Sequence, residues 1–318
     1  MFHNLRAKYF TKYDMPSKHL PEIWQDVMNL IDQNKYEELV NLYKNSQYTN
    51  RSAILDIIED IQNIDQIEKY CKQRFEDYVC CLFMGVAYIG RAANSRGAAI
   101  ASKTSDQQID GMYYYADKSR YILLSALDIN REDILVFEIL SGSLLYIGVD
   151  MDEVDGFYNE AKQLQGPKMN LNSRFLNIKT PKWLGSKKIL FDFINQACHK
   201  LPKGDPNFCL VGIAHYEYYL YLKMNKEYKK AADYMSNKNV KKDIKDACFN
   251  FVDHAELNED TMFAASLFLF FALEYNNKKM AKSLLIFTKL NINFARKPWN
   301  YEDEYETKYN AMRYLAGI

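Results

Sequence analysis

Residues 216–232 read YEYYLYLKMNKEYKKAA, and this stretch predicts two helices joined by a tight turn. Its first half is aromatic and apolar, whereas Ala231 and Ala232 lie early in its second half. A bulky residue on one helix that faces a small residue on the next lets the two helix axes approach closely. We therefore expect an antiparallel helix pair with its turn at residues 223–225.

A second stretch has the same pattern. Residues 267–281 read LFLFFALEYNNKKMA, so a bulky first helix is followed by a turn at Asn276 and Asn277 and then by the small residue Ala281. Residues 121–127, followed by Asn130, show a comparable helix end before a turn. The pairs recur at about 30 to 40 residues, which is the size of one helix–turn–helix repeat.

Helical periodicity continues along most of the chain. The isoleucines at spacings of three and four residues, which form one apolar stripe, are Ile54, Ile57, Ile58, Ile61 and Ile64. The chain has only 12 Gly and 7 Pro, and no stretch shows the sustained alternation of a strand. Residues 134–149 and 262–273 are apolar on every face, which predicts helices at the inside of the array.

About sixteen helices joined by short loops predict an all-α fold, specifically a TPR-like α-solenoid of stacked antiparallel helix pairs. Ser105 is expected to cap a long helix, and Pro181 to end another. We predict an N-terminal helical region over residues 1–76 and a TPR-like helical-repeat region over residues 77–318 that continues it.

The charges of the 318 residues balance, with 41 Lys and Arg against 41 Asp and Glu. A nucleic-acid binder normally carries a marked basic excess, and a membrane-surface protein carries basic clusters. We therefore predict neither a nucleic-acid partner nor a membrane partner. Neutrality of the whole chain does not exclude local patches of charge.

The six cysteines favour free thiols in a reducing compartment, because none forms a C-x-x-C pair and their spacing is irregular. The N-terminus lacks the apolar core of a signal peptide. The longest apolar run, residues 262–273, is shorter than the roughly 20 residues that span a bilayer. These features predict a cytoplasmic protein.

Common catalytic motifs are absent from the sequence, including the glycine-rich phosphate loops, H-E-x-x-H and G-x-S-x-G. The five histidines are scattered, and Cys198 and His199 would point about 100° apart on a helix. The sequence predicts no catalytic residue, no cofactor and no metal ligand.

Arg96 lies in a small and polar segment, residues 90–101, between two strongly apolar helices. One interpretation is a pocket in which Arg91 and Arg96 bind a carboxylate or phosphate. The other is a helix C-terminus, with basic residues against the helix dipole and Gly97 as the stop.

Trp183 lies in a second distinctive segment, Pro181-Lys182-Trp183-Leu184-Gly185-Ser186. Pro181 ends one helix, Gly185 permits a positive φ, and Ser186 caps the next helix. Trp183 then either fills a groove between helix pairs or is exposed as an anchor for a partner.

Single-sign charge gathers in three places. Residues 223–246 lean basic, and residues 302–306 are acidic. The densest acidic stretch, residues 150–160, has no basic residue and contains Asp150, Asp152, Glu153, Asp155 and Glu160. All three stretches can be interpreted as solvated helix faces. The two acidic stretches can also be interpreted as contacts for a basic protein.

Several of these segments together resemble an uncharacterised bacterial family of TPR-like proteins. The matching segments, in order, are Arg96-Gly97 with Ala101, Ser105-Asp106-Gln107-Gln108, the turn Leu127-Asp128-Ile129-Asn130, Pro181-Lys182-Trp183-Leu184-Gly185-Ser186, and Pro298-Trp299. The family usually has D-P where this chain has Asn130-Arg131, so that turn is less typical. The resemblance implies a helical-repeat fold and brings no biochemical activity.

Three functions are consistent with these observations. The first is an immunity protein that neutralises an antagonistic bacterial toxin by direct binding, and the second is an adaptor or scaffold in another assembly. The third is an enzyme with a site near Arg96. The candidate partner-binding residues are Asp150, Asp152, Glu153, Asp155, Arg96 and Trp183.

Overall fold

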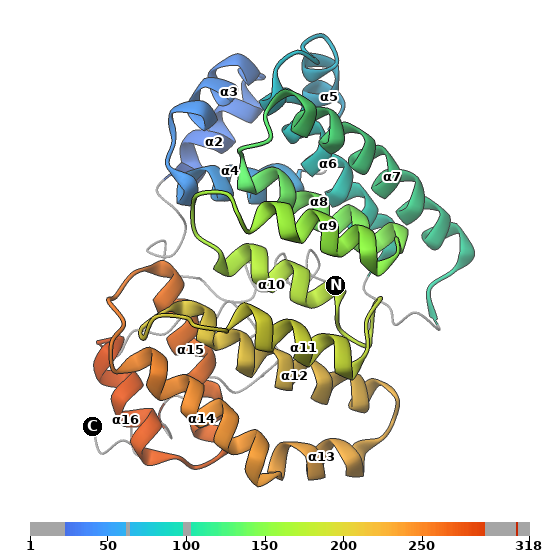
Figure 1. Cartoon of the computed structure of the whole chain (residues 1–318). Helices are drawn as coiled ribbons and strands as arrows, with labels where there is room; N and C mark the ends of the chain where they lie inside the picture. The colour runs from blue at the N-terminus through green and yellow to red at the C-terminus, as the bar shows by residue number, and fades with distance from the viewer. Residues whose placement is uncertain (1–22, 62–63, 98–102, 290–309, 311–318) are drawn as a thin grey trace. The chain divides into compact units, whose positions relative to one another are not determined.

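A computed structural model describes residues 23–61, 64–97, 103–289 and 310. Every secondary-structure element within these residues is helical, as Figure 1 shows. The prediction of an all-α fold is therefore confirmed for this part of the chain. The helix predicted over residues 301–315 and the acidic residues 302–306 lie outside the described residues.

The chain divides into two compact units, unit 1 (Met1–Pro167) and unit 2 (Lys168–Ile318). The boundary predicted between residues 76 and 77 lies inside unit 1, because α6 (Tyr78–Arg96) packs against three helices that precede the boundary. These helices are α3 (Tyr36–Asn45), α4 (Tyr48–Asp60) and α5 (Asp65–Cys71). The division also separates charge. Unit 1 has 17 Lys and Arg against 25 Asp and Glu, whereas unit 2 has 24 against 16.

Unit 1 is built around α6. Its helices are α2 (Ile23–Asp32), α3 (Tyr36–Asn45), α4 (Tyr48–Asp60), α5 (Asp65–Cys71), α6 (Tyr78–Arg96), α7 (Asp106–Ile129), α8 (Ile134–Ile147) and α9 (Met151–Ala161). The first two-thirds of α6 is buried on all sides, and α6 packs against α4, α7 and α8. Gly90 permits the close approach to α4, because a Cβ there would lie 2.0 Å from the carbonyl oxygen of Glu59.

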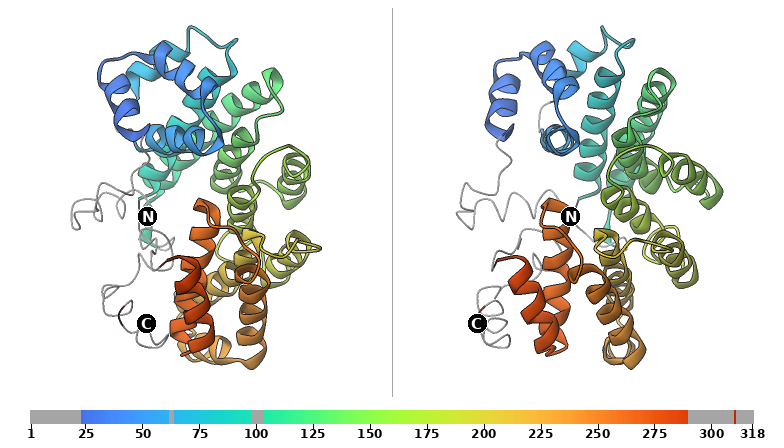
Figure 2. Two further views of the ribbon diagram at one scale, coloured as in Figure 1. Left: turned by 90° about the vertical axis from the view of Figure 1, so that its left-hand side faces the viewer. Right: turned by 60° about the vertical axis from the view of Figure 1, so that its left-hand side comes forward.

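Unit 2 has its own core of aromatic and aliphatic side chains. Its helices are α10 (Met169–Ile178), α11 (Lys187–Ala197), the short 3-10 helix η3 (Pro206–Phe208), α12 (Cys209–Met224), α13 (Tyr228–Ser236), α14 (Lys238–Val252), α15 (Glu259–Glu274) and α16 (Lys278–Phe287). Phe251 packs against Phe268 and Phe287, with ring centroids 5.8 and 5.6 Å apart. In the turned views of Figure 2, as in Figure 1, α15 and α16 run side by side.

Three helix pairs are joined by the same three-residue turn, namely α2–α3, α12–α13 and α15–α16. The middle residue of each turn has a positive φ, which is 55° at Asn34, 62° at Lys226 and 49° at Asn276. The N–H of the following residue donates to a carbonyl five positions back, as Lys35 does to Leu30 at 2.8 Å. This pattern satisfies terminal carbonyls of the first helix and reverses the chain. Helix pairs are thus confirmed at residues 216–232 and 267–281. The turn predicted at residues 223–225 was wrong by two positions, because α12 continues to Met224 and the turn is residues 225–227.

The other predicted helix features agree in part. α7 begins after Ser105, which accepts a hydrogen bond from the Gln108 N–H, so the predicted cap is confirmed. α7 ends differently from the three pairs, because Asn130 is extended, with a φ of −141°. The isoleucine stripe is also divided, since α4 ends at Asp60 and leaves Ile61 and Ile64 outside the helix. The two helices predicted to be apolar all round, α8 and α15, are largely buried.

Candidate functional site

Arg96 is the last residue of α6, followed by Gly97 with a φ of 68°. Its guanidinium donates to the Gly97 carbonyl at 3.2 Å, and the Gln108 side chain donates to the Arg96 carbonyl at 3.3 Å. This geometry matches the interpretation of Arg96 as a helix C-terminus tied to the start of α7. Residues 98–102, which complete the segment, lie outside the described residues.

Charged groups converge one helical turn before Arg96, in a small pocket that α5, α6 and α7 line and that includes Arg91. The Tyr88 hydroxyl donates to the Glu68 carboxylate at 2.7 Å, and the Lys72 ammonium lies 2.5 Å from the same group. Burial raises the pKa of Glu68, but the hydrogen bonds from Lys72 and Tyr88 outweigh it and lower the pKa. Burial and the neighbouring Glu68 raise the pKa of Tyr88.

These shifts bear on the alternative of an enzyme near Arg96. A general acid or base works best when its pKa lies near the working pH. Glu68 and Tyr88 are both shifted further from neutrality than their ordinary values. The directions favour a structural network that fastens α5 to α6, rather than acid–base chemistry.

Trp183 lies in the turn between α10 and α11, and three of its neighbours in that turn have structural roles. Ser186 caps α11 by accepting from the Ile189 N–H at 3.2 Å. A Cβ at Gly185 would lie 1.9 Å from a carbonyl oxygen of the chain, so only glycine fits there. Lys182 is largely buried, and its ammonium lies 2.5 Å from the Glu217 carboxylate on α12. Trp183 itself is half-buried.

The acidic stretch of residues 150–160 fastens α9 to the rest of unit 1. Asp150 caps α9 by accepting from the Glu153 N–H at 2.8 Å. The Glu153 carboxylate lies 2.6 Å from the Arg120 guanidinium on α7. Glu160 forms a two-pronged ion pair with Arg131, in the turn before α8. Because these carboxylates already have partners within unit 1, fewer of them can contact another protein than the charge of the stretch suggests.

The predicted site residues lie on different elements of the two units. The four acidic residues, Asp150, Asp152, Glu153 and Asp155, share the start of α9, and Arg96 ends α6. Trp183 belongs to unit 2 and the other five to unit 1.

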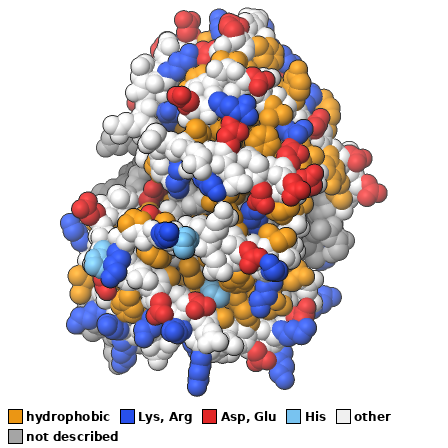
Figure 3. Space-filling model, in the orientation of Figure 1, with side chains coloured by type: hydrophobic (Ala, Val, Ile, Leu, Met, Phe, Trp, Pro, Cys, Tyr) orange, Lys and Arg blue, Asp and Glu red, His pale blue; other side chains and the backbone are white. Residues whose placement is uncertain are grey.

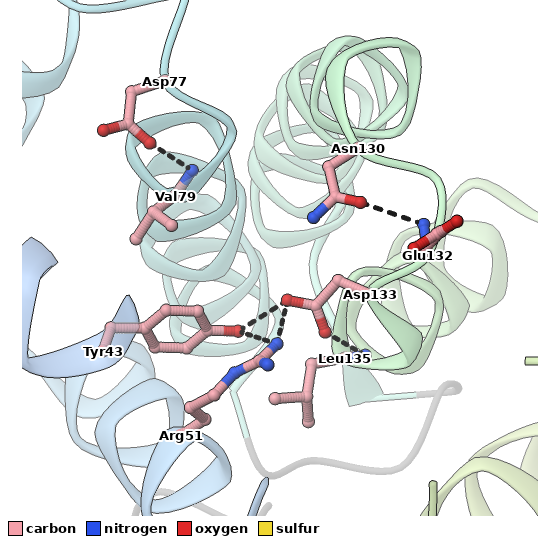
Figure 4. Close-up of polar contacts among 8 residues, drawn as sticks. All are labelled: Tyr43, Arg51, Asp77, Val79, Asn130, Glu132, Asp133 and Leu135. Atoms are coloured by element: carbon pink, nitrogen blue, oxygen red, sulfur yellow. Dashed lines mark hydrogen bonds and ion pairs between the residues drawn. The ribbon is translucent and has the colours of Figure 1, made fainter. Parts of the chain in front are cut away.

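A buried ion pair joins α3 and α4 to the start of α8, as Figure 4 shows. The Asp133 carboxylate accepts from the Tyr43 hydroxyl at 3.1 Å and also pairs with the Arg51 guanidinium. Its other oxygen caps α8 by accepting from the Leu135 N–H at 3.1 Å. Asp133 is only 6% exposed, so its partners replace the water that it has lost. The network is structural.

His215 is buried on α12, and its Nδ1 lies 2.7 Å from the Tyr234 hydroxyl. Burial, and then the nearby Lys187, lower the pKa of His215 to about 4. The Asp243 carboxylate lies 3.8 Å from Nε2, but a histidine with this pKa is neutral at pH 7 and forms no ion pair there. His215 is thus a neutral, hydrogen-bonded side chain of the core of unit 2 at pH 7.

The most exposed aromatic surface lies on α7. Nine large hydrophobic side chains are exposed among the described residues, and four of them belong to this helix. Tyr121 is 72% exposed, Tyr114 55% and Tyr113 45%. Asp110 and Asp117 are also exposed and fall on the same side of the helix. Figure 3 shows hydrophobic side chains, a class that includes tyrosine, among acidic ones on the part of unit 1 that contains α7.

We call these five residues the α7 face: Asp110, Tyr113, Tyr114, Asp117 and Tyr121. It was not among the residues predicted from the sequence, because a count of 25 tyrosines does not say which of them are exposed. The spacing of these residues does indicate a common face, since they recur at intervals of three, four and seven positions. This face lies on the side of α7 opposite buried Met112 and Leu123.

Lys118 shows how a cation meets this face. Its ammonium lies 4.4 Å from the centroid of the Tyr114 ring and 5.5 Å from that of Tyr88. The hydrogen bond with Tyr114 raises the pKa of Lys118, so the group is charged at neutral pH. An ammonium over an aromatic ring is a favourable contact.

Cysteines and candidate metal ligands are the remaining side chains of the described residues that could carry chemistry. All six cysteines are free and five are buried, and burial raises the pKa of Cys81 to about 11 and of Cys198 to about 12. No group of three or more His, Cys, Asp or Glu within the described ranges could hold a metal ion. None of the described helices is both long and apolar enough to cross a membrane.

No protein-family model matches the chain, and no curated protein or solved structure is significantly similar to it. The resemblance to the TPR-like family rests on the residues of this chain alone. Of its segments, Ala101 and Pro298-Trp299 lie outside the described residues.

Proposed function

We propose that the chain is a TPR-like helical-repeat protein that acts in the cytoplasm by binding a basic protein partner, without catalysis. The α7 face is the observation that carries the proposal. Tyrosine is enriched at protein interfaces because its ring offers a large, rigid contact area and its hydroxyl a hydrogen bond. Three strongly exposed tyrosines on one helix are more than solubility requires.

The charge around these tyrosines selects the partner. Asp110 and Asp117 share the face with the exposed rings, and unit 1 as a whole has eight more acidic than basic residues. A lysine or arginine of a partner can stack on a ring, as Lys118 does on Tyr114, while its charge faces an aspartate. The exposed Asp152 of α9 adds to the same field.

The repeated turn supports a TPR-like array. Three helix pairs with one turn geometry are what recurrence of a single helix–turn–helix unit would produce. Such arrays leave helix faces exposed along their length, and they take partners there. The buried free thiols are consistent with a reducing compartment.

The specific role that we propose is an immunity protein whose partner is a bacterial toxin. It rests on the general analogy that small, non-catalytic helical bacterial proteins often serve in this way. An adaptor in another assembly would use the same face, and the toxicity of the partner distinguishes the two roles.

The test is affinity capture from the native host with three forms of the full chain. We expect a basic protein to be retained by the wild type and lost when Tyr114 and Tyr121 are both changed to alanine. Tyr228→Ala is the matched control, because Tyr228 is 62% exposed but lies on unit 2. The captured protein is then produced alone in cells, with and without the chain, and growth is measured.

Each outcome is decisive. Retention of the same protein by the double variant would refute the α7 face as the binding surface, provided that circular dichroism shows an intact fold. A captured partner that is harmless to cells would refute immunity and leave the adaptor role. Interface tyrosines near the centre of a contact cost about 2 kcal/mol or more when truncated, so a loss of at least about thirtyfold in affinity is expected.

A further inference from the structure

A row of lysines follows the outer side of α14. They occur at spacings of three, four and seven residues, and they are Lys238, Lys241, Lys242 and Lys245. Val240, Ile244 and Phe251 occupy the opposite side and are buried in the core of unit 2. Seven residues of helix span about 10 Å, so the four side chains leave α14 within that length, in a band about 100° wide. Lys241 is half-buried, and its ammonium lies 5.2 Å from the ring centroid of Tyr275.

A second row on α16 adjoins the first. Lys278, Lys279 and Lys282 are exposed there, and α16 packs against α14. The Lys279 ammonium lies 4.9 Å from the ring centroid of Phe249 on α14, which connects the two rows. Figure 3 shows Lys and Arg side chains gathered on the part of unit 2 where α13, α14 and α16 lie in Figure 1. We call these seven lysines the lysine face.

Within the part of unit 2 that the structure describes, the ammonium groups of the lysine face are not held in ion pairs. None of the seven lysines has an ion pair with a carboxylate of the described residues. Asp243 and Asp246 flank the row on α14, and the Asp243 carboxylate lies 3.8 Å from His215. Unit 2 has eight more basic than acidic residues.

The chemistry of the lysine face fits a dense and regular anion. A protein interface normally has apolar or aromatic anchors at its centre, whereas Ile286 is the sole strongly exposed apolar side chain among the described residues of α14 and α16. An interfacial helix inserts a row of apolar residues into lipid, but the apolar rows of these helices are buried. Duplex nucleic acid carries one negative charge per about 1.7 Å of its axis, which matches closely spaced ammonium groups.

We propose that the lysine face of unit 2 binds the phosphate backbone of nucleic acid without sequence preference. The neutrality of the whole chain predicts the opposite, but it is the sum of an acidic unit and a basic unit. The relevant charge is that of the surface which meets the ligand, since charges more than about 10 Å apart are screened at moderate salt. The proposal does not depend on the partner of the α7 face.

Fluorescence anisotropy tests whether the lysine face binds nucleic acid. A labelled 20-base-pair DNA duplex is titrated with the full chain at a series of salt concentrations. The logarithm of affinity should fall linearly with the logarithm of salt, with a slope of about −4 or steeper. Changing the four lysines of α14 to glutamine should reduce that slope by about three to four and weaken binding at least about tenfold.

The control variant changes four lysines of unit 1 to glutamine, and they are Lys35, Lys69, Lys103 and Lys162. It alters the net charge of the chain by the same amount and should bind the duplex as the wild type does. No binding at the lowest salt, or equal losses in the two variants, would overturn the proposal. So would unchanged binding by the α14 variant, or tighter binding to vesicles of three parts phosphatidylcholine and one part phosphatidylserine than to the duplex.

Discussion

Units 1 and 2 share helix pairs with one type of turn, but their surfaces are opposites. Unit 1 has a net charge of −8 and exposes tyrosines and aspartates on α7, whereas unit 2 has a net charge of +8 and exposes lysines on α14 and α16. The overall charge of zero therefore describes neither surface. Electrostatic arguments about partners need the boundary between units first, because the field that a ligand meets is local.

The largest expected effect tests whether the two units are separate in stability as well as in charge. Phe251→Ala removes a fully buried ring from the core of unit 2 and should cost about 3–5 kcal/mol. If the units open independently, hydrogen exchange measured by mass spectrometry should accelerate in peptides of unit 2 and not in those of unit 1.

Phe137→Ala, in the core of unit 1, is the reciprocal variant, and it should accelerate exchange in unit 1 alone. Equal acceleration of exchange in both units would mean that the two units unfold together. The units would then differ in charge but not in stability. Phe251→Leu serves if the alanine variant does not fold, because it removes less volume.

The second prediction concerns buried charge, which occurs in both units. Lys182→Met in unit 2 removes the cation from Glu217, which is only 5% exposed, and should lower the free energy of unfolding by about 3 kcal/mol. Adding Glu217→Gln should recover much of that loss, since no buried charge then lacks its partner. Urea denaturation measures both variants. If Lys182→Met alone were as stable as the wild type, the ion pair would contribute nothing to the free energy of unfolding.

The third prediction concerns the pH dependence of the stability of unit 2. His215 of unit 2 has a folded pKa of about 4, below the 6.5 of an unperturbed histidine. Between these values the unfolded chain binds more protons than the folded one, so stability is full above pH 6.5 and falls as the pH drops towards 4. The total loss is about 3 kcal/mol, at 1.36 kcal/mol per pKa unit.

Urea denaturation at several pH values, followed by hydrogen exchange of unit 2, measures this loss. His215→Gln keeps a polar group beside Tyr234 but cannot titrate, so it should flatten the dependence between pH 6.5 and 4. An unchanged slope in that variant would assign the acid sensitivity to other groups.

The sequence predicts the features that depend on neighbouring residues. The helices, the Ser105 cap, and the pairs at residues 216–232 and 267–281 follow from periodicity and breakers within a few positions. The positive φ at Lys226 could not be predicted, because lysine rarely adopts it and the Schellman hydrogen bonds stabilise it there.

The candidate site is harder to predict, because it depends on contacts across the fold. Glu153 has the same charge in the sequence as exposed Asp152, but it meets Arg120 of α7, 33 residues earlier. Tyrosine counts do not distinguish exposed Tyr121 from buried Tyr43. Only the position of each residue on its helix does so, and that requires the buried side to be identified first.

The smallest expected effect follows from the difference between Asp152 and Glu153 on α9. Asp152 and Glu153 both lie in the first turn, so changing either to lysine loses a similar interaction with the helix dipole, about 0.5 kcal/mol. Glu153→Lys also breaks the pair with Arg120 and sets two cations against each other, which adds about 0.5–1 kcal/mol. Chemical denaturation of both variants should therefore rank Glu153→Lys as the less stable. Raising the salt concentration should narrow the difference, because the pair is partly exposed and is screened. Equal stability would mean that α9 is held by packing alone, and the acidic stretch would then be available in full to a basic partner.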